Sequence, residues 1–184
     1  MEKATVTTAQ VIEQTRKWIT EVVIACNFCP FAAREVKRNS IHYQVETSTE
    51  LQTCLKTFIQ ECKRLDEQPA VETVLIIFPH TFPLFGRYLE LVNKAERLLK
   101  KQGYEGVYQV ATFHPDYRFA GSPADDAANY TNRSPYPMLH LLREASIEQA
   151  LKHYTDPGNI PDRNIHFARE KGAAYMKMLR DACL

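Results

Sequence analysis

The sequence predicts an α/β fold: a small sheet of three mostly parallel strands, with helices on both faces and a helical C-terminal third. Strand-like and helix-like patterns alternate along the first two thirds of the chain, which is typical of parallel sheets with right-handed crossovers. The run 74–78 is apolar at every position, as a central strand buried on both faces requires. A length of 184 residues is typical of one domain, so we expect a single domain over 1–184.

The first expected elements are a helix and a strand near the N-terminus. Apolar residues at spacings of three and four predict an amphipathic helix over 8–26, with Thr7 and Gln10 as its capping box. Alternating apolar and polar residues predict a half-exposed strand over 41–45. The next helix would begin with a second capping box at Thr47 and Glu50, and its buried face would consist of Leu51, Leu55, Phe58, Cys62 and Leu65.

The middle of the chain predicts two more strands, over 72–78 and 107–113. A stripe of apolar residues predicts a helix over 84–101 that crosses between them, so we expect these strands to be parallel neighbours in the spatial order 1-2-3. The first helix and the C-terminal helices would cover the opposite face of the sheet. Those C-terminal helices are expected over 138–145, over 147–154 with a capping box at Ser146 and Gln149, and over about 162–183.

Composition and charge exclude several classes of partner. Lys and Arg number 23 and Asp and Glu number 22, so the net charge is +1. Such a balance does not indicate the excess of positive charge that is typical of nucleic-acid-binding proteins. The longest apolar run has only the length of a strand, and the N-terminus lacks the apolar core of a signal peptide, so we expect no membrane association. Five cysteines, an odd count, disfavour a secreted disulfide framework. We therefore expect a cytoplasmic protein, with its oligomeric state left open.

The segment 114–137 is the anomalous part of the sequence. From Ala111 to Pro137 there is no Leu, Ile or Val, so the segment has no periodic core face. Connections of this length without regular structure are uncommon in compact domains and are usually functional or disordered. The aromatic residues of the segment disfavour disorder. We therefore expect an ordered loop that packs across the carboxyl edge of the sheet and forms a site.

Four segments carry a resemblance to a known family: Cys29-Pro-Phe-Ala, Phe113-His-Pro-Asp-Tyr-Arg-Phe, Asn129-Tyr-Thr-Asn-Arg-Ser-Pro-Tyr-Pro and Leu139-His-Leu-Leu-Arg-Glu-Ala-Ser. The chain resembles the uncharacterised bacterial family known as domain of unknown function fourteen-fifteen (DUF1415). The likeness covers nearly the whole length. It implies a free-standing bacterial protein of one domain, and it brings no reaction, cofactor or catalytic residue with it.

Histidines at strand ends are the candidate catalytic residues. His80 and His114 each follow a predicted parallel strand, and ligands of such sheets bind at the carboxyl ends of the strands. His114 with Asp116 would act as an acid/base pair, and His140 would assist, because imidazole transfers protons near neutral pH. The alternative is that His80 and His114 only bond loop carbonyls. His114, Asp116 and His140 could also form a metal site, but their spacing matches no recognised motif, so no metal is predicted.

The second half of the same loop predicts an anion site. Pro137 would open the helix expected over 138–145, and a helix N-terminus offers unpaired N–H groups to an anion. Arg133 would add a guanidinium fork beside it. The alternative is that Arg133 pairs with Asp125 or Asp126 and only pins the loop. The remaining candidate anion-binding residues are Asn129, Asn132, Ser134 and Arg118.

The cysteines give a weaker signal. Cys26 and Cys29 form a Cys-x-x-Cys, but at the predicted C-terminal end of a helix, where the dipole does not favour a thiolate. Cys29 is the candidate for reactivity, because Pro30 would end the helix beside it. Cys54 and Cys62 share an apolar helix face, so we expect both to be buried, unpaired and inert.

The leading hypothesis from the sequence is an enzyme that acts on a small anionic metabolite. Its site would be formed by the 114–140 loop and the carboxyl edge of the sheet. The first alternative is a non-catalytic metabolite-binding or regulatory domain with the same pocket. The second is a thiol-redox protein that uses Cys29. The reaction type, the substrate and any cofactor stay open.

Overall fold

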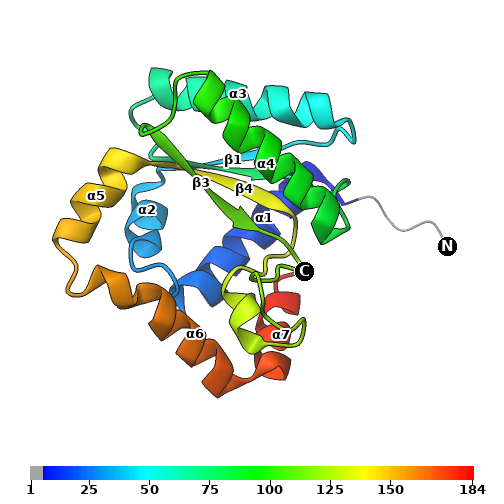
Figure 1. Ribbon diagram of the computed structural model, residues 1–184, viewed down its shortest axis with the longest axis vertical. Helices are drawn as coiled ribbons and strands as arrows, with labels where there is room; N and C mark the ends of the chain where they lie inside the picture. Colours follow the sequence, from blue (N-terminus) through cyan, green and yellow to red (C-terminus); the bar gives the residue numbers. More distant parts are fainter. Residues whose placement is uncertain (1–5) are drawn as a thin grey trace.

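The computed structural model describes residues 6–184, and within them four strands form one sheet between two layers of helices (Figure 1). The strands are β1 (Ile41–Val45), β2 (Thr73–Ile77), β3 (Tyr108–Phe113) and β4 (Met138–Arg143). The helices are α1 (Thr8–Trp18), α2 (Ala32–Arg38), α3 (Leu51–Glu67), α4 (Phe85–Lys101), α5 (Glu144–Lys152), α6 (Ile160–Lys171) and α7 (Ala173–Asp181). The α/β class expected from the sequence is therefore observed.

The strand count and the pairing differ from the prediction. The sheet has the order β1-β2-β4-β3, with β1 parallel to β2 and β4 antiparallel to both of its neighbours. The expected sheet of three mostly parallel strands is therefore wrong, because two of the three pairings are antiparallel. β2 and β3 run in the same direction but do not pair, since β4 lies between them. The two ends that carry His80 and His114 still lie at the same edge of the sheet.

The extra strand β4 occupies the segment 138–143, where a helix was expected. Met138, Leu139 and Leu141 are completely buried, and successive residues point to opposite faces of the sheet. A short run that is apolar on both faces fits a buried strand and a buried helix equally well by its pattern. In the folded protein, β2 and β3 lie on either side of this segment and pair with its backbone. These long-range hydrogen bonds favour the strand over the helix.

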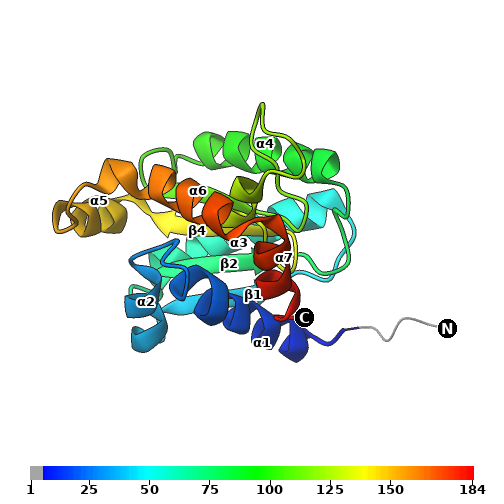
Figure 2. The same cartoon turned by 90° about the horizontal axis from the view of Figure 1, so that it is seen from below.

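Helices cover both faces of the sheet, as expected. α3 and α4 pack on one face, where the core includes Phe58, Leu91 and Leu139. α1, α6 and α7 pack on the other face around Trp18 and Met138 (Figure 2). The side chain of a sheet residue therefore enters one of two separate cores according to its position in the pleat.

Several helix boundaries depart from the expected ones. The capping box of Thr7 and Gln10 forms, but the helix it opens changes at Ile19 to a π-helical turn over Ile19–Ile24. The box expected at Thr47 and Glu50 does not form, since Glu50 caps α3 without a side-chain hydrogen bond. α5 begins at Glu144, directly after β4, so Ser146 does not cap it. The single C-terminal helix expected over 162–183 is two helices, which meet at Gly172, where φ is +82°.

The 114–137 segment is held by hydrogen bonds along its length. Its two ends pair with each other, because the His114 amide donates to the Asn132 carbonyl and the Ser134 amide donates to the His114 carbonyl. Its centre forms a 3-10 turn over Ala127–Thr131 that packs against α6 and α7.

Two other expectations concern the cysteines and the membrane. Cys54 and Cys62 are both buried and free, which confirms the prediction for their packing. No helix in the described part of the chain is long and apolar enough to cross a membrane.

Candidate functional site

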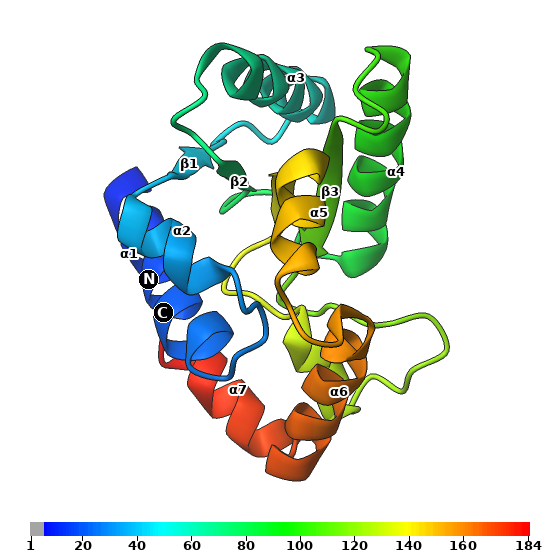
Figure 3. The ribbon, with the colours of Figure 1, turned by 90° about the vertical axis from the view of Figure 1, so that its left-hand side faces the viewer.

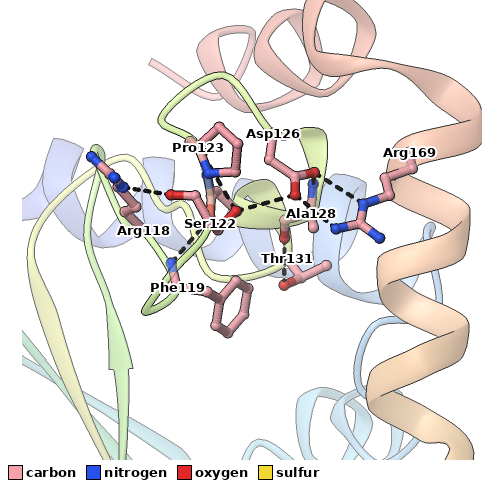
Figure 4. Close-up of polar contacts among 9 residues, drawn as sticks. Arg118, Phe119, Ser122, Pro123, Asp126, Ala128, Thr131 and Arg169 are labelled. Carbon is pink, nitrogen blue, oxygen red and sulfur yellow. Dashed lines mark hydrogen bonds and ion pairs between the residues drawn. The ribbon is translucent and has the colours of Figure 1, made fainter.

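The candidate anion-binding residues use their polar groups inside the 114–137 loop. Asn129 is completely buried; its side-chain oxygen accepts from the Phe119 amide at 3.0 Å and its side-chain nitrogen donates to the Pro123 carbonyl at 2.8 Å. Arg118 donates to the carbonyl of Ser122 at 2.6 Å (Figure 4). These contacts help to fix the fold of the loop, and the buried Asn129 side chain is not available to an anion, whereas the exposed Arg118 uses only its Nε.

Arg133 serves the same loop. Its guanidinium donates to the carbonyls of Tyr117 at 3.1 Å and Ala124 at 2.8 Å, and it lies over the ring of Tyr130. Ser134 donates to the carbonyl of Tyr136 at 2.5 Å, and the remaining candidate, Asn132, donates to Thr112. Because the segment after Pro137 is a strand, the helix N-terminus expected beside Arg133 does not exist.

An ion pair does pin the loop, with a partner that the sequence did not suggest. Asp126 pairs with Arg169 of α6 at 2.8 Å and also accepts from the Ala128 amide at 2.9 Å, as Figure 4 shows. The hydrogen bonds from Arg169 and Ala128 hold the pKa of Asp126 well below its usual range. The loop is thus fastened to the C-terminal helices and not through Arg133.

His114 has both ring nitrogens occupied by backbone groups. Nδ1 accepts from the Asp116 amide, and Nε2 donates to the Phe82 carbonyl, both at 2.9 Å. The ring is completely buried beside Phe85 and Tyr88 of α4, and burial lowers its pKa. Phe82 has a φ of +59°, a conformation that bulky residues rarely adopt. His114 therefore helps to hold the strained turn that leads into α4.

The expected cluster of His114, Asp116 and His140 does not assemble. His114 packs against α4 on one face of the sheet, whereas His140 points to the face covered by α1. Asp116 and His80 are exposed, and no hydrogen bond among the described residues joins their side chains to either histidine. Within residues 6–184, no three His, Cys, Asp or Glu side chains are grouped as a metal site would require.

His140 instead lies at the floor of a cavity of about 320 Å³, which we name the His140 pocket. Strands of the sheet form its floor, and helical segments form its walls; among them are α2 and α5, whose ribbons lie beside each other in Figure 3. Its lining is mostly apolar and includes Trp18, Ile19, Val23, Phe31, Leu75, Ala111, Phe113, Leu142 and Ile147. Two of these residues, Ile19 and Val23, belong to the π-helical turn, a feature that often occurs at functional sites.

Hydrogen bonds fix the protonation of His140. Its Nε2 lies 2.6 Å from the Thr73 hydroxyl oxygen, which lies 2.5 Å from the Leu141 carbonyl oxygen. The single hydroxyl proton must lie between the two oxygens, so Nε2 carries a proton and donates to Thr73. Burial lowers the pKa of His140 to about 4, so the ring is neutral at pH 7. Nδ1 is then an acceptor, and no described residue donates to it.

Trp18 supplies an unpaired donor in the same pocket. Its indole is only 2% exposed, and Nε1 has no hydrogen-bond partner among the described residues. Phe113 links the two polar groups, since its ring centroid lies 5.2 Å from that of Trp18 and 6.2 Å from that of His140. Trp18, with its unpaired donor, and His140, with its free acceptor, therefore line one aromatic-walled cavity.

A family model described as protein of unknown function (DUF1415) matches residues 10–178. The chain belongs to the DUF1415 family. This finding confirms the resemblance inferred from the sequence. No curated protein and no solved structure matches the chain.

In this DUF1415 protein, the sequence-predicted Cys29 lines the His140 pocket. It also lines a neighbouring cavity of about 340 Å³ that shares Val23 and Phe113 with the first. Burial raises the pKa of the Cys29 thiol, and that of Cys26 as well. A raised pKa lowers the thiolate fraction on which redox reactivity depends.

Two polar residues of the His140 pocket were not identified from the sequence. Thr73 is a polar residue at the start of an apolar strand, which was an available signal for a special role. Trp18 continues the apolar stripe of its helix and gives no sign that its N–H group lacks a partner.

Proposed function

We propose that the protein binds a small, uncharged, largely apolar molecule in the His140 pocket. The observation that carries this proposal is the buried indole N–H of Trp18. Buried polar groups in native proteins nearly always have a hydrogen-bond partner, and leaving one unpaired costs about 1–3 kcal/mol. An acceptor atom on a bound ligand would satisfy Trp18 Nε1 and recover that cost.

The hydrogen-bonding pattern of the pocket defines the ligand further. His140 Nδ1 accepts and Trp18 Nε1 donates, so the ligand needs both a donor and an acceptor. A hydroxyl group has both, and the aromatic walls suit a flat ring. A hydroxylated aromatic molecule therefore fits the site, and the volume of about 320 Å³ is at the small end of the usual range for ligand pockets.

The charges of the pocket favour an uncharged ligand over the anion expected from the sequence. The two cationic residues in the lining have partners within the protein. Arg34 pairs with Glu35 at 2.5 Å, and Arg143 donates to the carbonyls of Leu65 and Val71. His140 is neutral, and the lining holds two carboxylates, Glu35 and Glu72, beside the two guanidinium groups, so the pocket has no net positive charge to attract an anion.

Binding is favoured over turnover. A general base works best when its pKa lies near the operating pH, and His140, with a pKa of about 4, is a weak base at neutral pH. The raised pKa of Cys29 likewise disfavours thiol catalysis. The arrangement is that of a sensor or carrier of a small molecule, which corresponds to the non-catalytic alternative derived from the sequence.

The single tryptophan of the chain makes the proposal directly testable. We expect one indole N–H signal in the ¹H–¹⁵N spectrum of the protein, and because Trp18 lines the pocket, this signal would report on it. We expect neutral phenols from a fragment set to shift this signal and to change the fluorescence of Trp18. Matched benzoates, which carry a charge, should have a smaller effect.

A pocket-filling variant provides the control. Ala111→Leu places three extra carbon atoms in the pocket and should abolish the shifts. Val110→Leu enlarges the neighbouring residue, which packs into the core on the opposite face, and should leave them unchanged. If no fragment shifts the indole signal, or if the shifts persist in Ala111→Leu, the His140 pocket is not the binding site.

A further inference from the structure

A second hollow lies on the opposite side of the sheet, on the outer surface between α3 and α4. It has a volume of about 630 Å³, and half of its ten lining residues are cationic. None of the lining residues is acidic, and the salt bridges found in the described chain involve none of these cations. We name this surface the basic groove, and its cations are Lys56, Lys63, Lys94, Arg97 and Lys101.

The basic groove is a local concentration of charge. The whole chain has a net charge of only +1, so the acidic residues that balance these cations lie elsewhere. Five like charges around one hollow repel each other, which costs stability unless a negative partner offsets it. α3 and α4 pack side by side, as Figures 1 and 3 show, so the charges lie on a fixed frame.

The cations of the groove repeat at helical spacing. Lys56 and Lys63 lie seven residues apart on α3, and Lys94 and Lys101 lie seven apart on α4. Seven residues are two turns of helix, which corresponds to about 10 Å along each axis. Between the two rows, the apolar residues of the lining are Leu55, Ile59 and Leu98. The groove thus has cationic rims and a narrow apolar floor.

We propose that the basic groove docks an acidic amphipathic helix of a partner protein. The apolar stripe of such a helix would cover the floor, and acidic residues beside the stripe, one heptad apart, would meet the two rows of lysines. Nucleic acid fits less well. Of the five cations only one is arginine, no aromatic residue in the lining can stack on a base, and a phosphate backbone would leave the apolar floor uncovered.

The test uses a fluorescein-labelled synthetic peptide of three heptads, with leucine at the two core positions and glutamate beside them. Its binding to the full chain is measured by fluorescence anisotropy. Lys63→Glu/Lys94→Glu should weaken binding on the order of tenfold or more, because like charges across an interface repel. The matched control, Lys37→Glu/Lys152→Glu, makes the same charge change on α2 and α5 and should bind normally.

Further arms of the same experiment separate a helix from other polyanions. A scrambled peptide of the same composition should bind weakly, and Ile59→Thr should weaken only the amphipathic peptide. The proposal is overturned if the scrambled peptide, a single-stranded oligonucleotide or anionic phosphatidylserine vesicles bind as well as the amphipathic helix. It is also overturned if the peptide does not bind or if both charge-reversal variants behave alike. Ala111→Leu should leave peptide binding unchanged, so this proposal and the His140 pocket can fail independently.

Discussion

Replacing His140 with glutamine will make the protein more resistant to acid than the wild-type chain, relative to its stability at neutral pH. The folded state holds the pKa of His140 at about 4, against an ordinary value of 6.5. Between pH 6.5 and pH 4, His140 is therefore protonated in the unfolded chain and still neutral in the folded chain. This difference stabilises the unfolded state progressively as the pH falls toward 4, and it reaches its limit below pH 4.

The size of the effect follows from the shift. A difference of 6.5 − 4 = 2.5 pH units corresponds to about 3 kcal/mol at 1.36 kcal/mol per unit. The residue is only partly buried, so we expect a loss of about 2–3 kcal/mol in the wild type between pH 7 and pH 4 that His140→Gln does not show. Glutamine keeps an N–H donor for Thr73, although its neutral-pH stability will also change.

Urea unfolding at half-unit steps from pH 4 to pH 8, followed by far-ultraviolet circular dichroism, measures the effect. The informative quantity is the difference between the two proteins as a function of pH, because His42 and His114, whose pKa values burial also lowers, contribute equally to both. His153→Gln, at an exposed position, is the matched control and should track the wild type. Parallel stability curves for wild type and His140→Gln would refute the burial and neutrality assigned to His140.

Three further outcomes are expected. Tyr88→Phe should lower the free energy of unfolding in urea by about 1–3 kcal/mol, because the buried hydroxyl donates to the Met138 carbonyl and accepts from the Phe113 amide. Tyr104→Phe removes only an exposed hydrogen bond and should lower it less. Arg169→Ala should increase hydrogen exchange of the amides in 118–131 with little change at β2; unchanged exchange there would mean that the ion pair does not hold the loop. Ellman's reagent at pH 7 should leave Cys54 and Cys62 unlabelled until the protein unfolds, because burial raises the pKa of Cys54 to about 11 and that of Cys62 to about 12.

The sequence predicts well those elements whose secondary structure follows from their own pattern of apolar residues. The 17-residue helices α3 and α4 each show one continuous apolar stripe, and β2 is apolar throughout. β4 is different, since six apolar and polar residues in a row fit a short strand or the first turns of a helix. Its conformation depends on hydrogen bonds to two strands that lie far away in the sequence, and no local pattern records them.

The site was harder to predict for the same reason. His114 at a strand end looks available in the sequence, but its Nε2 is occupied by the carbonyl of Phe82, 32 residues earlier. Arg133 looks like an anion-binding residue, yet two of its N–H groups donate to carbonyls of its own loop. The residue type indicates which hydrogen bonds or proton transfers a side chain can make. Its partners in the folded protein determine whether those groups remain free to act on a ligand.

The insertion of β4 explains why the candidate site lies on the face of the sheet and not at its edge. In a parallel sheet of three strands, functional residues would gather where the strands end, as expected for His80 and His114. β4 instead pairs His140 with Leu75 on one side and Ala111 on the other, which places the imidazole in the middle of the sheet. α5 follows β4 without a loop and forms one wall of the pocket that opens above His140. The same strand that corrects the predicted topology therefore supplies part of the floor of the His140 pocket and leads directly into the helix that forms one wall.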